Sequence, residues 1–179
     1  PPPPPSLNPI VPFVDAALVT ASGSVRSPGS FVTVGGGTTP VFEDLADGDN
    51  SFSITVPIKQ ESVNTLSVTT MNEFGLVSLP AIATVVEGAA FPAAVTTVAS
   101  LAITPCPAPT VALNASLPFT CTVTFSDAST ANVTQFVQWE DTENGETITA
   151  GGLYVNTNAG IAQVRAFVAG VFTKVVIVR

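Results

Sequence analysis

Apolar and polar residues alternate with a period of two in short runs along almost the whole chain. In the segment ADGDNSFSITV, Phe52, Ile54 and Val56 alternate with Ser and Thr. Residues two apart in a strand face the same side of a sheet, so these three side chains are expected to share a buried face. Gly, Pro, Asn and Asp interrupt the runs every 8 to 12 residues or so, and helical periodicity is almost absent. The pattern predicts an all-β fold of the sandwich type.

The same pattern places the individual strands. In the first half of the chain we expect strands at 17–25, 30–35, 51–57, 64–71 and 76–86, and in the second half at 95–104, 119–126, 135–140, 153–155, 161–169 and 173–178. Turns are expected at MNEFG, where Gly75 accepts a left-handed backbone, and at Ala169–Gly170.

A length of 179 residues suits two domains of about 90 residues each. The short, uncharged stretch AAFPAA marks the junction between them. We therefore expect four segments: a proline-rich spacer at 1–5, a first sandwich at 6–88, a linker at 89–92 and a second sandwich at 93–179. Five prolines in a polyproline II helix span about 16 Å at ~3.1 Å per residue, which suits a stiff mechanical spacer.

Low charge is the most informative feature of the composition. Charged residues make up 10% of the chain, hydrophobic residues 46%, and the net charge is −8. With five scattered basic residues, the chain lacks the cationic surface that nucleic acids and anionic membranes require. The uncharged stretch 88–126 is broken by several prolines, so no membrane-spanning helix is expected. A Thr- and Ser-rich, weakly charged β-protein is typical of secreted and cell-surface locations.

No catalytic constellation is expected. The chain has no His, so nucleophile–His pairs cannot form. The carboxylate pairs Glu43/Asp44 and Glu140/Asp141/Glu143 lie in turn-rich segments that predict solvated surface positions. We therefore predict a protein that is not an enzyme and that requires no cofactor, with calcium as the one candidate.

The calcium hypothesis concerns the acidic turn that contains Asp44, Asp47 and Asp49. Several oxygen ligands within a short loop are what Ca²⁺ prefers. The spacing fails the EF-hand pattern, and the alternative is an ordinary acidic β-turn in which Asp and Asn side chains bond their own backbone. Of the two, the sequence favours the ordinary turn.

Two cysteines, Cys106 and Cys121, are separated by 14 residues. In a weakly charged, Thr-rich chain this pair is expected to form one disulfide in an oxidising compartment. The alternative is a pair of free thiols. Two Cys and no His do not fill the tetrahedral ligand set of zinc.

The second half carries a family resemblance. The run LPFTCTVTFSDASTANVTQFVQWE, followed by GGLYV and AGIAQVRAFVAGVFTKVVIV, resembles the bacterial immunoglobulin-like (Ig-like) domain of group 2. The resemblance implies that Trp139 packs between the two sheets of a sandwich. Core positions are accordingly expected at Trp139 and Phe125 in the second domain, and at Phe52 and Val68 in the first. The two cysteines depart from the family pattern.

Residues 6–88 resemble another bacterial Ig-like type, through SGSV, PGSFVTV, DGDNSFSITVPI and NTLSVTTMNEFGLVS. Together the resemblances imply two tandem Ig-like sandwiches in a secreted or surface-anchored prokaryotic protein. The expected function is that of a structural module of a fibre, stalk or adhesin. The alternatives are a glycan- or protein-binding module attached to a secreted enzyme, and a decoration protein of a phage or virion.

Copies of the chain itself, or a cell-surface glycan or protein, are the expected partners. Sheet edges with few charges invite pairing with another chain, and the candidate edge segments are KVVIVR, LAIT and SLNPIVPFV. The alternative is that these segments pair within their own domains. Asn114 and Asn132 stand in N-x-S/T patterns that fit glycosylation acceptors.

Overall fold

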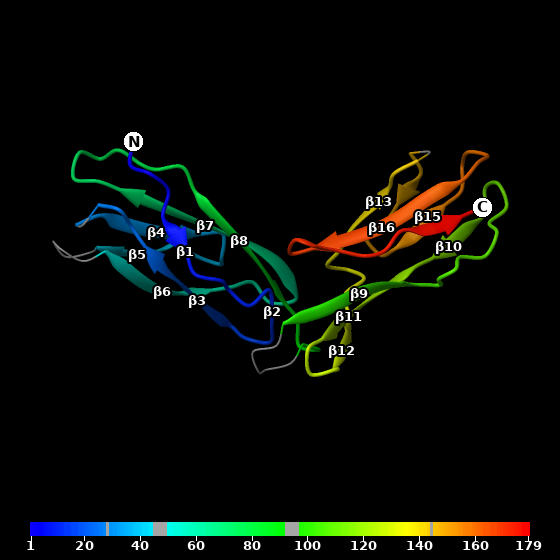
Figure 1. Cartoon of the computed structure of the whole chain (residues 1–179), viewed down its shortest axis with the longest axis horizontal. Coiled ribbons are helices and arrows are strands. Elements are labelled where there is room, and N and C mark those ends of the chain that lie inside the picture. Colours follow the sequence, from blue (N-terminus) through cyan, green and yellow to red (C-terminus); the bar gives the residue numbers. More distant parts are fainter. Residues whose placement is uncertain (28, 45–49, 92–96, 144) are drawn as a thin grey trace. The chain divides into compact units, whose positions relative to one another are not determined.

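The computed structural model describes residues 1–27, 29–44, 50–91, 97–143 and 145–179. The chain divides into two compact units, Pro1–Val95 and Thr96–Arg179 (Figure 1). The described residues form strands, turns and loops and contain no helix, so none of them forms a helix that could cross a membrane.

Unit 1 is a sandwich of two sheets. One sheet has the order β1-β3-β6 and the other the order β2-β8-β7-β4-β5. The strands are β1 (Ser6–Leu7), β2 (Phe13–Val14), β3 (Leu18–Ser24), β4 (Phe31–Gly35), β5 (Val41–Asp44), β6 (Ser51–Pro57), β7 (Ser62–Met71) and β8 (Ala81–Glu87).

The alternation in the sequence produces the core of unit 1. Along β6, Phe52, Ile54 and Val56 are buried while the residues between them are exposed. They meet side chains of the opposite sheet, among which Val68 is fully buried. Because side chains in a strand alternate between faces, one apolar stripe from each sheet is enough to build this core.

The N-terminal segment contributes to both sheets of unit 1. β1 pairs antiparallel with β3, and β2 pairs parallel with β8 in the second sheet. The proline run lies against the same unit, because Pro5 is buried and the Pro3 carbonyl accepts a hydrogen bond from the Thr70 hydroxyl at 3.5 Å. The N-terminal segment therefore crosses from one sheet of unit 1 to the other.

Unit 2 is also a sandwich. Its strands are β9 (Val98–Thr104), β10 (Ser116–Pro118), β11 (Thr120–Phe125), β12 (Thr130–Asn132), β13 (Gln138–Asp141), β14 (Thr147–Ile148), β15 (Leu153–Val155), β16 (Ala162–Val168), β17 (Val171–Phe172) and β18 (Val176–Val178). One layer joins the groups β12-β11-β9 and β10-β15-β14, and the other contains β13, β16, β17 and β18.

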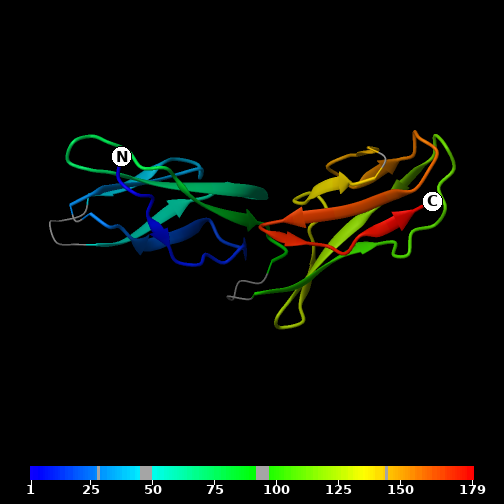
Figure 2. The same cartoon turned by 45° about the horizontal axis from the view of Figure 1, so that its top comes forward.

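Phe119 connects the two parts of the first layer. It is the one residue between β10 and β11, and its N–H donates to the Gly152 carbonyl at 2.8 Å, which continues the pairing with β15. Its ring is buried, 6.3 Å from the ring centroids of both Tyr154 and Trp139. In the second layer β16 lies between β13 and β18 (Figure 2). The fold is therefore all-β, as the alternation predicts, with two tandem Ig-like sandwiches, as the family resemblances imply.

Most strand positions agree with the sequence prediction, and β6 and β15 agree at both ends. The turn at Ala169–Gly170 is confirmed, with both residues at positive φ. The strand expected at 76–86 begins only at Ala81, and its first five residues form a loop in which all but Ser78 are exposed. The two-residue strands β1, β2, β14 and β17 and the short strands β5, β10 and β12 were not predicted from the sequence.

Candidate functional site

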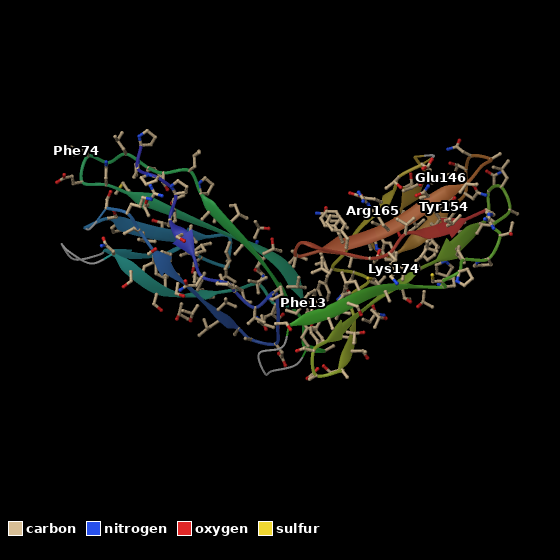
Figure 3. The ribbon with its side chains drawn as sticks, in the orientation of Figure 1. Phe13, Phe74, Glu146, Tyr154, Arg165 and Lys174 are labelled. Carbon is tan, nitrogen blue, oxygen red and sulfur yellow. The ribbon has the colours of Figure 1, made fainter. Side chains whose placement is uncertain are left out.

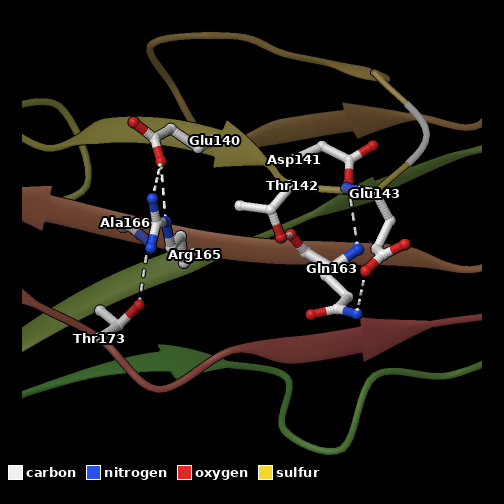
Figure 4. A network of polar contacts seen from close by, with 8 residues as sticks. All are labelled: Glu140, Asp141, Thr142, Glu143, Gln163, Arg165, Ala166 and Thr173. Atoms are coloured by element: carbon white, nitrogen blue, oxygen red, sulfur yellow. Dashed lines mark hydrogen bonds and ion pairs between the residues drawn. The ribbon is translucent and has the colours of Figure 1, made fainter.

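Four of the five acidic residues of unit 2, Glu140, Asp141, Glu143 and Glu146, lie at the end of β13 and in the turn that follows it. The Asp141 carboxylate accepts hydrogen bonds from the N–H groups of Glu143 at 3.1 Å, Glu146 at 2.9 Å and Gln163 at 3.0 Å. Figure 4 shows Gln163 between Asp141 and Glu143, with its side-chain amide donating to Glu143 Oε1 at 2.7 Å. These carboxylates hold the β13–β14 turn against β16.

Glu146 is the most buried of these acids, with 7% of its surface exposed. Its carboxylate accepts hydrogen bonds from the Thr157 N–H at 2.9 Å, the Thr157 hydroxyl at 2.6 Å and the Asn158 N–H at 2.6 Å. Burial by itself raises the pKa of Glu146, and the charge of Asp141 also raises it. The three hydrogen bonds outweigh both effects and hold this pKa below its ordinary value.

Tyr154 lies beside this acidic group (Figure 3). Burial raises the pKa of its phenol, and the negative charges of Glu146 and Asp141 raise it further. A general acid needs a carboxyl group whose pKa is raised toward neutral pH. Since the pKa of Glu146 is shifted the other way, the arrangement suits a structural clamp on the loop after β15.

Unit 1 uses a buried carboxylate in the same way. Glu87, at the end of β8, is 2% exposed and accepts a hydrogen bond from the Glu61 N–H. The Glu61 side chain in turn accepts the Ala89 N–H at 2.9 Å. Both carboxylates satisfy backbone donors that would otherwise lack partners, which is a stabilising role.

The outward face of β13, β16, β17 and β18 carries an aromatic and ionic surface. Phe167 and Phe172 stack with ring centroids 5.1 Å apart, and the Arg165 guanidinium lies 5.3 Å from the Phe172 centroid. Arg165 also forms an ion pair with Glu140 at 2.8 Å (Figure 4). Both charged side chains are 38% exposed, so the pair contributes little stability, about 0–1 kcal/mol. Its effect is to hold the cation against the exposed Phe172 ring.

A hollow of about 330 Å³ opens beside β18. Arg179 is its one charged lining residue, and the other lining residues are Cys106, Pro107, Ala108, Thr110, Val175, Val176 and Ile177. Val175 and Ile177 are exposed, because they alternate with the buried Val176 and Val178. The hollow therefore combines apolar side chains with polar surface and has a cation at its border.

A second hollow, of about 360 Å³, is lined by Asn132, Thr134, Gln135 and Gly151. Asn132 is exposed, and its Oδ1 accepts the Thr134 N–H at 2.9 Å, so the N-x-T motif forms a local turn. Asn114, in the other acceptor motif, is also exposed and has φ 64°.

The largest exposed apolar group of unit 1 is the loop between β7 and β8. We call residues 72–80 the apolar loop. Its exposed fractions are 77% for Phe74, 51% for Leu76, 52% for Val77 and 74% for Leu79. Figure 3 shows Phe74 at the tip of this loop, away from both sheets of the unit. Single exposed apolar residues are ordinary, but four within six positions mark an interaction surface.

Hydrogen bonds fix the conformation of the apolar loop. Asn72 Oδ1 accepts the N–H groups of Phe74 at 3.1 Å and Leu76 at 2.9 Å, and Gly75 adopts φ 74°. Ser78 and Thr70 exchange two further hydrogen bonds, from Ser78 N–H to the Thr70 carbonyl at 2.8 Å and from Thr70 N–H to Ser78 Oγ at 3.0 Å. The loop therefore presents its apolar side chains from an ordered backbone. The turn expected at MNEFG is confirmed. The strand expected to begin at Leu76 is not formed there, so the sequence prediction did not indicate this exposed apolar surface.

The predicted disulfide is not formed. Cys106 and Cys121 are both free. Cys121 points from β11 into the core of unit 2, and burial raises the pKa of its thiol to about 11. Cys106 is exposed in the loop after β9, outside that core. Spacing along the chain could not reveal that the two side chains lie in different environments.

The structure describes the predicted calcium ligands only in part. Asp47 and Asp49 lie outside the described residues, and for Asp44 the structure describes the backbone alone, paired with Phe31 in β5. Among the residues described, no group of three or more Cys, Asp or Glu is placed to hold a metal ion. The calcium site stays a hypothesis.

Of the four predicted core residues, three are deeply buried: Phe52, Val68 and Phe125. Trp139 is half-buried, with its indole N–H 3.3 Å from the Thr134 carbonyl. The candidate edge segments pair within their own units. β18 pairs with β16, LAIT in β9 pairs with β11, and the N-terminal segment pairs with β3 and β8.

No protein-family model matches the chain, and no curated protein matches it. Among solved structures, the fibronectin(III)-like modules of Clostridium thermocellum CbhA are 18% identical, with 97% of this chain and 91% of that chain covered and a TM-score of 0.33. The D00–D0 domain of intimin is 11% identical, with 98% and 96% covered and a TM-score of 0.33. Extracellular domains 3–5 of Drosophila OTK are 9% identical, with 97% and 64% covered and a TM-score of 0.31. Similarity at this level gives no information about function.

Proposed function

We propose that this protein is a non-catalytic structural module of a secreted or surface-anchored prokaryotic assembly, as a subunit of a fibre, stalk or adhesin. The observation that carries the proposal is the apolar loop of unit 1, an ordered segment that exposes Phe74, Leu76, Val77 and Leu79. An ordered apolar surface of this kind indicates a protein partner, because leaving it in water is unfavourable.

The carboxylates support the same proposal. Asp141, Glu146 and Glu87 accept hydrogen bonds from backbone N–H groups and so stabilise turns. The low fraction of charged residues and the Thr- and Ser-rich surface also fit a secreted location. The two specific Ig-like groups suggested by the sequence remain part of this proposal.

Two measurements test the proposed function. Analytical ultracentrifugation and electron microscopy of the full chain over a range of concentrations should show concentration-dependent assemblies. Antibodies raised against the chain should label intact cells that produce it. A strict monomer that is found only inside those cells would overturn the proposal.

The aromatic surface of unit 2 favours a second candidate, a glycan-binding module. The exposed Phe172 ring lies beside the hydrogen-bonding groups of Arg165 and Glu140, and sugars bind to such combinations of an aromatic ring and polar groups. Affinity electrophoresis in gels that contain soluble polysaccharides tests this candidate. A retardation that is lost in Phe172→Ala and kept in Phe74→Ala would favour it over the structural function.

A further inference from the structure

The apolar loop and the hollow beside β18 have complementary chemistry. In the loop, Glu73 is the one charged residue among residues 72–80, and it stands next to Phe74. In the hollow, Arg179 is the one charged lining residue, and it borders the exposed side chains of Val175 and Ile177. The loop therefore presents an anion beside an exposed aromatic ring, and the hollow presents a cation beside two exposed aliphatic side chains, which is a complementary pair of surfaces.

The hollow is lined in part by the stretch of the sequence that is richest in basic residues. The basic residues Arg165, Lys174 and Arg179, three of the five in the chain, belong to the last 15 residues. Unit 1 carries most of the acidic residues. Unit 1 has 8 acidic and 2 basic residues and unit 2 has 5 and 3, so both units are net negative. The attraction between copies is therefore local, between Glu73 and the cation of Arg179.

The size of the hollow limits what can occupy it. A volume of about 330 Å³ lies at the small end of the range for ligand pockets, so it suits one or two apolar side chains. Phe74 is the most exposed of the large apolar side chains in the described residues, and it projects from the loop tip (Figure 3). Because Asn72 holds the loop in one conformation, little conformational entropy is lost on docking.

We propose that the apolar loop of one copy docks on unit 2 of a second copy, with Phe74 in the hollow lined by Val175 and Ile177 and with Glu73 facing Arg179. This inference rests on the proposed function, since it names the contact through which the module would assemble. The two surfaces differ, so the contact is heterologous and extends from copy to copy as an open chain or a closed ring.

The test measures association of the full chain by sedimentation velocity over a range of concentrations. Phe74→Asp is expected to weaken association more than tenfold, because a buried aromatic anchor contributes strongly to an interface. Leu18→Asp is the matched control. Leu18 is 56% exposed on β3, in the other sheet of unit 1, and its substitution should leave association unchanged.

Charge reversal tests the pairing of the two surfaces. Glu73→Lys and Arg179→Glu should each weaken association about fivefold, and the double variant should return to within about twofold of the wild type. The positions substituted in these association tests, Leu18, Glu73, Phe74 and Arg179, are all exposed. Far-UV circular dichroism and Trp139 fluorescence verify that each variant is folded.

Each outcome decides the inference. Assemblies that persist unchanged in Phe74→Asp would overturn the docking contact and leave the structural function in place. A wild type that is monomeric at every concentration would overturn the docking contact. If that monomer also bound neutral phosphatidylcholine vesicles through Phe74, the loop would be a lipid contact. A double variant that associates no better than the single variants would overturn the Glu73–Arg179 pairing.

Discussion

Asn72 and Leu76 are joined by hydrogen bonds in both directions. The Leu76 N–H donates to Asn72 Oδ1 at 2.9 Å, and the Asn72 N–H donates to the Leu76 carbonyl at 3.1 Å. The side chain of Asn72 also accepts the Phe74 N–H, so one amide group organises the tip of the apolar loop. Short polar side chains that bond nearby backbone groups commonly fix turns in this way.

The first prediction concerns this amide. Asn72→Ala removes the acceptor of two N–H groups, so amide hydrogen exchange at Phe74 and Leu76 should become faster. Asp127→Ala is the control, because Asp127 accepts the Ser129 N–H in a turn of unit 2 at 2.9 Å. Exchange in residues 72–80 should not change in the control. Equal exchange in Asn72→Ala and wild type would show that the loop is ordered by other contacts.

Glu146→Gln should destabilise the protein at pH 7, by about 1–2 kcal/mol, because buried hydrogen bonds to a carboxylate are weakened. The folded pKa lies below the ordinary value of 4.5, so the contribution of this charge is present above pH 4.5 and is lost as the pH falls through the folded pKa. The stability difference between variant and wild type should therefore shrink below pH 4.5. Denaturant titrations at several pH values measure it.

The exposed Glu143 provides the control for this pH dependence. Its carboxylate accepts one side-chain hydrogen bond from Gln163. Glu143→Gln should have nearly the same stability as the wild type at each pH. A stability difference for Glu146→Gln that stays constant down to pH 3 would contradict the proposed clamp.

The cysteines should react at very different rates. A thiol reagent should modify Cys106, which is exposed, within minutes at neutral pH, and should spare Cys121, which is buried with a pKa raised to about 11. Two thiols should react after unfolding. Mass spectrometry counts the labels, and Cys106→Ser should abolish labelling of the folded protein. A mass two daltons lower in the absence of reductant would instead reveal a disulfide.

Two phenylalanines offer a matched test of burial. Phe125→Ala removes a ring that is 1% exposed and should destabilise unit 2 by about 3–5 kcal/mol. Phe74→Ala removes a ring that is 77% exposed and should change stability by less than about 0.5 kcal/mol. Trp139, the one tryptophan in the chain, reports unfolding of unit 2 by fluorescence. Similar losses in both variants would mean that Phe74 packs against its own chain.

For the acidic turn with Asp44, Asp47 and Asp49, we expect ordinary turn chemistry. The melting midpoint should then be the same with calcium and with a chelator. A rise of the midpoint that increases with calcium concentration, and that Asp47→Asn and Asp49→Asn abolish, would establish a calcium site.

The sequence was most informative where the apolar pattern continued over several residues. In β6 and β16 every second side chain is buried, as the alternation predicts. The prediction was least accurate at 76–80, where Leu76, Val77 and Leu79 suggested a strand. There Asn72 and Ser78 bond the backbone locally and Pro80 interrupts, so β8 begins only at Ala81.

The sequence by itself determined the all-β architecture, because a period of two fixes which side chains can share a face. The absence of His also excluded nucleophile–His catalysis before any fold was known. The tertiary structure alone decided that Cys121 is buried while Cys106 is exposed, and that Glu146 bonds Thr157 and Asn158. It also decided that the apolar loop faces solvent. These properties depend on contacts between residues that are distant in the sequence, or on hydrogen bonds between side chains and the nearby backbone. A pattern of apolar positions predicts neither kind of contact.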